Sequence, residues 1–174
     1  STDAILERLS ALHPKLIDLS LGRIERLLAA LGNQEQSLAP VVHVAGTNGK
    51  GSTAAMIRAG IEGSGATTHA YTSPHLAYFH ERIRLAGELV SEPLLARLLE
   101  ASERANAGQP SPSFEITTCA AFLGFARVAA DHVLPEARLG GRPAPTNVTA
   151  RPQPPNLTPA SLDRPQHTCS SLSR

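Results

Sequence analysis

A glycine-rich octapeptide at residues 46–53 holds the residue types that bind phosphate. Glycines let successive backbone N–H groups turn inward around phosphate oxygens. Lys50 is suited to bridge the β- and γ-phosphates of a nucleotide, and Ser52 or Thr53 can offer a hydroxyl to Mg²⁺. The spacing departs from the common GxxxxGK[ST] form, because a further glycine follows the lysine. The candidate phosphate-binding residues are Gly46, Thr47, Asn48, Gly49, Lys50, Gly51, Ser52 and Thr53.

The elements around this loop favour phosphate binding over a plain glycine-rich turn with one exposed lysine. Residues 40–45 form a β-branched run, which predicts a buried parallel strand. Residues 51–63 then predict a helix with Ala54, Ile57 and Ile61 on its inner face. A phosphate held between them would meet the positive end of the helix dipole.

The rest of the ordered part alternates helices and strands. Apolar spacing predicts a helix over residues 21–31, ended by Gly32 and Asn33, and a further helix over 114–130. Ser91 and Pro93 predict the start of another helix, with Ser91 as its cap. Residues 67–71 and 132–134 are expected strands. This order predicts a three-layer α/β fold with a parallel sheet and right-handed crossovers.

Composition excludes several function classes. Lys plus Arg number 16 and Asp plus Glu 15, a net charge of +1, which disfavours a nucleic-acid-binding protein. No run of 18 apolar residues occurs, so we expect no membrane span. The first residues lack a signal-peptide pattern, and two cysteines among 174 residues suggest no disulfide framework. We therefore expect a cytoplasmic protein.

Composition changes along the chain. Eight of the 14 prolines lie at or after Pro135, where the apolar residues show no period. Such a segment buries too little surface to offset its ordering entropy. We expect a globular domain over residues 1–142 and an irregular, poorly ordered Pro/Arg-rich tail over 143–174. Pro135 itself is expected to interrupt a buried strand.

Several motifs in order resemble one known family. The string Val44–Thr53, VAGTNGKGST, resembles the phosphate loop of the folylpolyglutamate synthase and dihydrofolate synthase family, a branch of the Mur-type ATP-dependent amide ligases. Similar family motifs are Leu21-Gly22-Arg23-Ile24, Thr72-Ser73-Pro74-His75-Leu76, Glu81-Arg82-Ile83-Arg84, Ser113-Phe114-Glu115, the 136–147 segment and Ser161-Leu162-Asp163. The match is dense to about residue 134 and patchy after it.

The resemblance implies a fold, a reaction and a site. It implies that residues 1–142 are an incomplete ATP-binding domain of the Mur-ligase central type. It also implies ATP-dependent ligation of L-glutamate to dihydropteroate or a folate through an acyl phosphate. Lys50 and the loop amides would hold ATP, and Ser52, Ser73 and Glu136 would be Mg²⁺ ligands or their supports. Pro74, His75, Arg82 and Phe114 would lie on the substrate side.

Departures from the family pattern leave three interpretations open. Ala144 and Arg164 replace an aspartate and a histidine of the family pattern, and family members are more than twice as long. In the first, the chain is an N-terminal portion of the ligase that is inactive alone, either a truncated gene product or one part of a split enzyme whose C-terminal domain is on another chain. Alternatively it is a stand-alone nucleotide-binding module or NTPase, or a decayed fragment. On residue pattern alone, Ser73 also fits a turn, Glu136 a solvated carboxylate, and Cys119 a core position.

Overall fold

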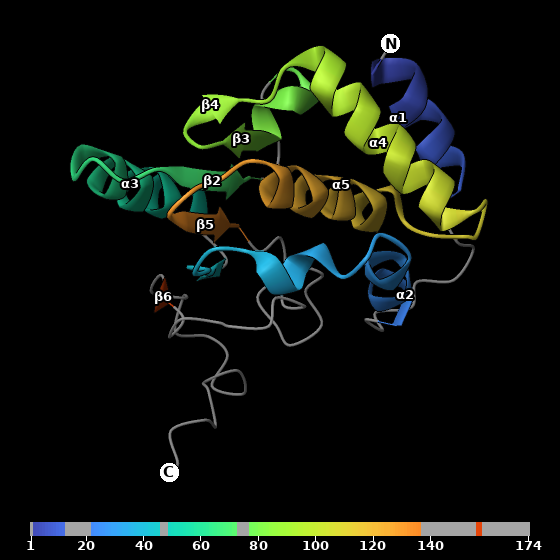
Figure 1. The fold of residues 1–174 in the computed structure, drawn as a ribbon. Helices are drawn as coiled ribbons and strands as arrows, with labels where there is room; N and C mark the ends of the chain where they lie inside the picture. The colour runs from blue at the N-terminus through green and yellow to red at the C-terminus, as the bar shows by residue number, and fades with distance from the viewer. Residues whose placement is uncertain (1, 13–21, 46–48, 73–76, 137–155, 158–174) are drawn as a thin grey trace, which may run out of the picture.

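Two helix layers enclose a mixed β-sheet in the computed structural model, which describes residues 2–12, 22–45, 49–72, 77–136 and 156–157 (Figure 1). The α-helices are α1 (Thr2–Ala11), α2 (Gly22–Ala30), α3 (Lys50–Gly63), α4 (Glu92–Asn106) and α5 (Ser113–Arg127), with short 3₁₀ helices η1 (Gln34–Ser37) and η2 (Phe79–Arg82). The strands are β1 (Val44–Ala45), β2 (Thr68–Tyr71), β3 (Ile83–Leu85), β4 (Glu88–Leu89), β5 (His132–Pro135) and β6 (Asn156–Leu157). The predicted three-layer α/β class is confirmed.

The sheet is mixed, whereas the sequence predicted a parallel one. Strands pair in the order β4-β3-β2-β5, with β2 parallel to β5 and β3 antiparallel to both neighbours. Two parallel bridges, Val41 to Val133 and Val44 to Glu136, extend the sheet from β5 to β1. The antiparallel part is a hairpin turning at Ala86 and Gly87, whose φ angles are 51° and 91°. Positive φ at both turn residues matches the twist of a two-residue hairpin.

Pro135 is the last residue of β5 and pairs within it, whereas the sequence predicted an interruption of the strand there. It is a buried strand residue in register with Tyr71. Alternate residues of a strand donate their N–H groups to the same neighbouring strand. The Val133 N–H donates to the Pro40 carbonyl in the segment that leads into β1, so Pro135 faces the same segment but has no N–H to donate. The ladder on that side is accordingly reduced to isolated bridges at Val133 and Glu136.

Alternation along the strands assigns one face of the sheet to α3 and the other to α5. Ala70 and Leu134 pack with Ala54 of α3, whereas their neighbours Tyr71 and Val133 belong to the larger cluster around α5. Successive strand residues point to opposite faces. The helix α5 therefore lies on the face opposite α3, and α1, α2 and α4 pack around it (Figure 1).

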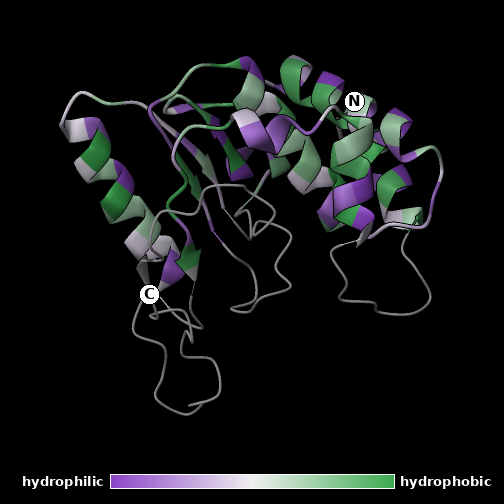
Figure 2. Cartoon of the chain, turned by 60° about the horizontal axis from the view of Figure 1, so that its bottom comes forward, coloured by the Kyte–Doolittle hydropathy of each residue, from purple (hydrophilic) through white to green (hydrophobic). Residues whose placement is uncertain are grey.

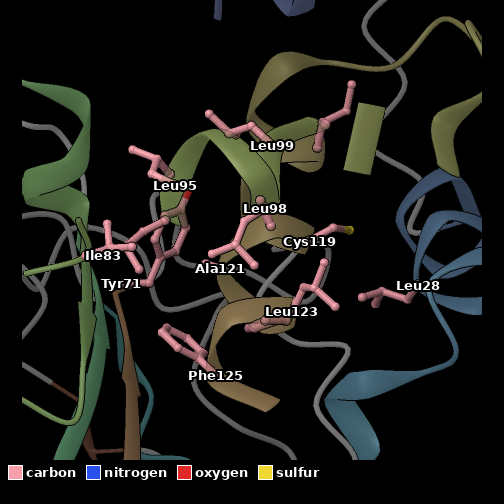
Figure 3. Close-up of a cluster of buried hydrophobic side chains, with 14 of the residues drawn as sticks. Leu28, Tyr71, Ile83, Leu95, Leu98, Leu99, Cys119, Ala121, Leu123 and Phe125 are labelled. Carbon is pink, nitrogen blue, oxygen red and sulfur yellow. The ribbon is translucent and has the colours of Figure 1, made fainter. Parts of the chain in front are cut away.

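The main core lies between α5, α4 and the sheet. Its buried side chains converge from separate elements, with Tyr71 and Ile83 from strands, Leu95 and Leu98 from α4, and Phe125 from α5 (Figure 3). Almost all of α5 is buried, which explains why its sequence is apolar on every side. The helix ends at Arg127, three residues before its predicted end.

The predicted tail lies outside the described residues apart from β6, which pairs in parallel with β1. The domain boundary at residue 142 also falls outside them. No described helix has the length and apolar character needed to cross a membrane.

Candidate functional site

Three strands end at one edge of the sheet, and the candidate site is built there. Since β1, β2 and β5 are parallel, their carboxyl ends at Ala45, Tyr71 and Pro135 lie at a shared edge. The register fixes this closely: Val44 bridges Glu136, and the Glu136 N–H donates to the Tyr71 carbonyl at 2.7 Å. In open α/β sheets, ligands bind outside the carboxyl ends of the strands.

The second half of the glycine-rich loop starts α3 at this edge. Gly49 is the residue before the helix, with φ 74° and ψ 1°, a left-handed conformation that glycine adopts without strain. Its carbonyl accepts the Thr53 N–H at 2.9 Å, so the first helical turn is closed. Lys50 is partly buried and Ser52 is exposed. Gly46, Thr47 and Asn48 lie outside the described residues.

Two of the three residues predicted for Mg²⁺ lie in the described part of the chain. Glu136, directly after β5, is 5% exposed, and Ser52 lies in the first turn of α3. Ser73 lies outside the described residues, one position after Thr72. Carboxylate and hydroxyl oxygens are the donors that Mg²⁺ prefers. No group of three or more His, Cys, Asp or Glu gathers as a metal site among the residues that the structure describes.

A backbone hydrogen bond joins Thr72, directly after β2, to Arg82, directly before β3. The Thr72 N–H donates to the Arg82 carbonyl at 2.9 Å, and β2 then pairs with β3. The Glu81 carboxylate accepts the N–H groups of Ala77 and Tyr78 at 3.0–3.2 Å. The Arg82 guanidinium lies 4.9 Å from the centre of the Phe79 ring. The candidate substrate residues Pro74 and His75 lie outside the described residues.

Phe114 belongs to the same edge through its contact with β2. It lies in the first turn of α5, partly buried, with its ring stacked on Tyr71 at 6.2 Å between centroids. Its carbonyl accepts the hydroxyls of Thr117 and Thr118 at 3.1 and 2.7 Å. Since Tyr71 is the last residue of β2, the Phe114 ring lies close to the carboxyl end of this strand.

Sequence reasoning missed two polar contacts that shape these elements. Arg23 of α2 and Glu115 of α5 form a two-bonded ion pair, with Nε–Oε2 at 3.2 Å and Nη2–Oε1 at 3.0 Å. The His69 ring of β2 contacts the Val128 carbonyl through Nε2 and accepts the Ala86 N–H at Nδ1. Neither pair carries a sequence signal, because the partners are far apart along the chain.

Three further side chains, Cys119, His43 and His80, are buried or contact a neighbouring element. Cys119 is fully buried, as expected, and burial raises the pKa of its thiol. Burial also lowers the pKa of His43, which lies in the strand segment before the loop. His80 contacts Glu92 of α4 at 2.9 Å, and the Thr2 hydroxyl and then this contact lower the pKa of that carboxyl.

Comparisons with known proteins find relatives over most of the chain. The chain is 43% identical over 136 residues to a Bacillus subtilis dihydrofolate synthase/folylpolyglutamate synthase, covering 74% of the chain and 31% of that protein. The Escherichia coli enzyme of the same name is 36% identical over 144 residues, covering 82% and 34%. Escherichia coli FolC in complex with DHPP and ADP superimposes with a TM-score of 0.80 at 33% identity, covering 86% and 36%. The chain belongs to the folylpolyglutamate synthase/dihydrofolate synthase family.

The family match covers a limited part of those enzymes. The chain spans about a third of the length of the curated relatives it matches. A Yersinia pestis folylpolyglutamate synthase/dihydrofolate synthase complexed with AMPPNP and a manganese ion also matches, with a TM-score of 0.80 at 31% identity, over 86% of this chain and 36% of that one. No model of a protein family matches the chain.

Proposed function

We propose that the chain is the N-terminal, nucleotide-binding part of an ATP-dependent ligase that joins L-glutamate to dihydropteroate or a folate. One observation carries the proposal. The start of α3, Thr72 and Glu136 lie at one edge of the sheet in a member of a family whose solved structures hold ADP or AMPPNP. In such ligases, ATP phosphorylates the substrate carboxylate, and the glutamate amine displaces phosphate from the resulting acyl phosphate.

The chain's own residues would supply charge neutralisation rather than a nucleophile. Lys50 and the N–H groups at the start of α3 would hold the β- and γ-phosphates, where the helix dipole is positive. Phosphoryl transfer depends mainly on positioning and on such electrostatic stabilisation. Lys50 is thus the residue expected to act on the transferring group.

Ser52, Ser73 and Glu136 are the residues that would hold Mg²⁺. The fit rests on the oxygen donors at this edge and on the Glu136 carboxylate, which is almost completely shielded from water. When bound, the ion would neutralise charge on the phosphate oxygens. The residues Pro74, His75, Arg82 and Phe114 would bind the pterin-bearing substrate, and Phe114 offers a partly buried aromatic face for it.

The remaining two thirds of the relatives' length is where we expect the rest of the active site. In this proposal a C-terminal domain, on another chain or on a longer form of this one, completes the ATP and glutamate sites. An acyl phosphate in an open half-site would be exposed to hydrolysis. We therefore expect the isolated chain to bind Mg²⁺–ATP without forming the amide.

Thermal unfolding with ligands tests the proposal. Mg²⁺–ATP at 100 times its dissociation constant adds about 2.7 kcal/mol of stability, a shift of a few degrees for a domain of this size. We expect this shift in the wild-type chain and its loss in Lys50→Ala. The matched control is Arg58→Ala, a change on the same helix two turns from the loop, which should keep the shift. An equal shift in wild type and Lys50→Ala would contradict the proposed nucleotide site.

Turnover assays separate the proposal from the alternatives. Amide formation from dihydropteroate, glutamate and ATP by the isolated chain would show that no further domain is needed. ATP hydrolysis that ignores dihydropteroate and glutamate would favour a stand-alone NTPase. A broad melt without any ligand shift would indicate a decayed fragment.

A further inference from the structure

The ion pair between Arg23 and Glu115 connects α2 to the substrate side of the site. Its two hydrogen bonds are parallel, and the side chains are only 15% and 10% exposed. The two residues are 92 positions apart, and each lies in the first turn of its helix. Paired arginine–carboxylate contacts fix orientation as well as distance, because the guanidinium is planar.

The pair acts on the part of α5 that carries Phe114. Glu115 follows Phe114 directly, so fixing the Glu115 carboxylate fixes the rotation of this first turn. The Phe114 ring in turn stacks on Tyr71, and the Tyr71 hydroxyl lies 3.4 and 3.5 Å from the hydroxyls of Thr117 and Thr118. A chain of contacts therefore runs from α2 to the carboxyl edge of the sheet.

A second, weaker contact supports the same junction. Arg26, one turn after Arg23, lies 3.5 Å from the Ser111 hydroxyl, which donates to Asn106 at 2.9 Å. Both Asn106 and Ser111 are buried, and they bracket the turn that leads from α4 into α5. The helix α2 thus contacts both the approach to α5 and its first turn.

We propose that Arg23 is a positioning residue: through Glu115 it orients the first turn of α5, so that Phe114 presents its ring to the pterin-bearing substrate. This inference rests on the proposed function for the identity of the ligand. It assigns to α2 an effect on substrate affinity, although Arg23 itself need not touch the substrate. Nucleotide affinity should be independent of it, since α3 lies on the opposite face of the sheet.

The chain provides a matched control. Arg8 of α1 and Glu103 of α4 form a pair with the same two-bonded geometry, at 3.0 and 2.8 Å. That pair is more exposed, at 55% and 27%, and exposed pairs contribute little. Arg8→Gln therefore removes the same kind of ion pair, but between α1 and α4 rather than at the first turn of α5 that carries Phe114.

The experiment compares the wild-type chain with Arg23→Gln, Arg23→Lys and Arg8→Gln. Dissociation constants for dihydropteroate and for Mg²⁺–ATP are measured by calorimetry. Arg23→Gln should weaken dihydropteroate binding about tenfold, because a small displacement of a positioning group is costly. Arg23→Lys keeps the charge and one hydrogen bond, so it should recover part of the loss. ATP binding should stay within about twofold in all three variants.

The outcomes distinguish this inference from the proposed function. A lower melting temperature for Arg23→Gln with unchanged dihydropteroate affinity would mean a merely structural pair and would overturn the inference. If the wild-type chain bound no dihydropteroate, the proposed function would fail. Hydrogen exchange tests separately the step from Arg23 to the first turn of α5, on which the inference depends: Arg23→Gln should speed exchange at the Glu115 and Ile116 amides, which bond to Pro112. Unchanged exchange there would overturn it.

Discussion

At the scale of single residues, Glu136 is the side chain on which the proposed metal site depends most. Its backbone is held at the junction of β1, β2 and β5, and the residue is almost completely buried. Glu136→Gln keeps the size of the side chain and removes its charge. We expect the variant to lose the part of the ATP-induced melting shift that requires Mg²⁺, which is a few degrees at most. Melting curves with ATP, with and without Mg²⁺, measure this.

The control for Glu136 lies at the other end of the same strand. Asp131 precedes β5, and its exposed carboxylate accepts the N–H and hydroxyl of Thr67, contacts that lower its pKa. Asp131→Asn should change stability slightly and leave the Mg²⁺-dependent shift intact. If both variants lost the shift equally, the proposed role of Glu136 would be wrong.

His69 predicts how stability depends on pH. Burial lowers the pKa of His69, which is 1% exposed and lies between the Val128 carbonyl and the Ala86 N–H. A depressed folded-state pKa means that the unfolded chain binds more protons below about pH 6.5. The free energy of unfolding should therefore fall as pH drops from 7.5 to 5.5. His43, whose pKa is also lowered, adds in the same direction.

Urea unfolding of His69→Gln isolates this contribution. The variant lacks the titrating ring and should be less stable at pH 7.5 by about 1–3 kcal/mol, since a buried hydrogen-bond partner is lost. Its stability should also fall less between pH 7.5 and 5.5 than that of the wild type. Parallel pH profiles for the two proteins would exclude His69 as the titrating group.

At the scale of elements, Gly124 sets how closely α5 approaches its neighbours. A Cβ at this position would lie 3.0 Å from Leu98 Cδ1 of α4 and 3.4 Å from Leu85 Cδ2 of β3. Gly124→Val should therefore lower the free energy of unfolding by about 1–3 kcal/mol through overpacking. Gly60→Ala on α3 meets no atom within 4 Å and should instead stabilise by about 0.5–1 kcal/mol. Urea titration measures both, and a stable Gly124→Val would show that α4 can move away.

Elements with a local signal could be predicted from the sequence, and those that depend on distant partners could not. The periodicity of residues 51–63 and the Ser91–Pro93 start predict α3 and α4 closely, since apolar spacing and capping are local. The β3–β4 hairpin turns at Ala-Gly, which lacks the asparagine or aspartate that usually marks such a turn. Pro135 predicted an interrupted strand. Its pairing with β2 on one side and the isolated bridges toward β1 on the other depend on residues distant in sequence, so they could not be predicted locally.

The candidate site divides in the same way. The phosphate loop, Glu136 and Phe114 could be singled out from motifs, because their types and order along the chain carry the signal. Glu136 is placed beside the ends of β1 and β2 by the parallel register, and Phe114 by its contact with Tyr71. Arg23 and Glu115 also lie in family motifs, but their pairing had no signal, because arginine and glutamate are both common on solvated helix faces and these two are far apart along the chain.

At the scale of the whole molecule, the two faces of the sheet are covered unequally. The α5 face buries a large cluster that includes Tyr71, Leu98 and Phe122. On the other face α3 contributes one buried residue, Ala54, with Ile57 and Ile61 partly buried. Figure 2 shows α3 standing apart from the other helices, at the left of the view. Since buried apolar area is the main favourable term in folding, α3 is held less strongly.

This inequality predicts that α3 opens before the rest of the described fold unfolds. Gly51, Gly60 and Gly63 weaken it further, because glycine is a poor helix former, and Met56 on its outer side is 73% exposed. Hydrogen exchange should give α3 amides a lower opening free energy than those of α5. Because the proposed phosphate site includes the first turn of α3, Mg²⁺–ATP should slow exchange in α3 and leave α5 nearly unchanged. Equal opening free energies for the two helices, with no selective protection by the nucleotide, would mean that the two faces unfold as one unit.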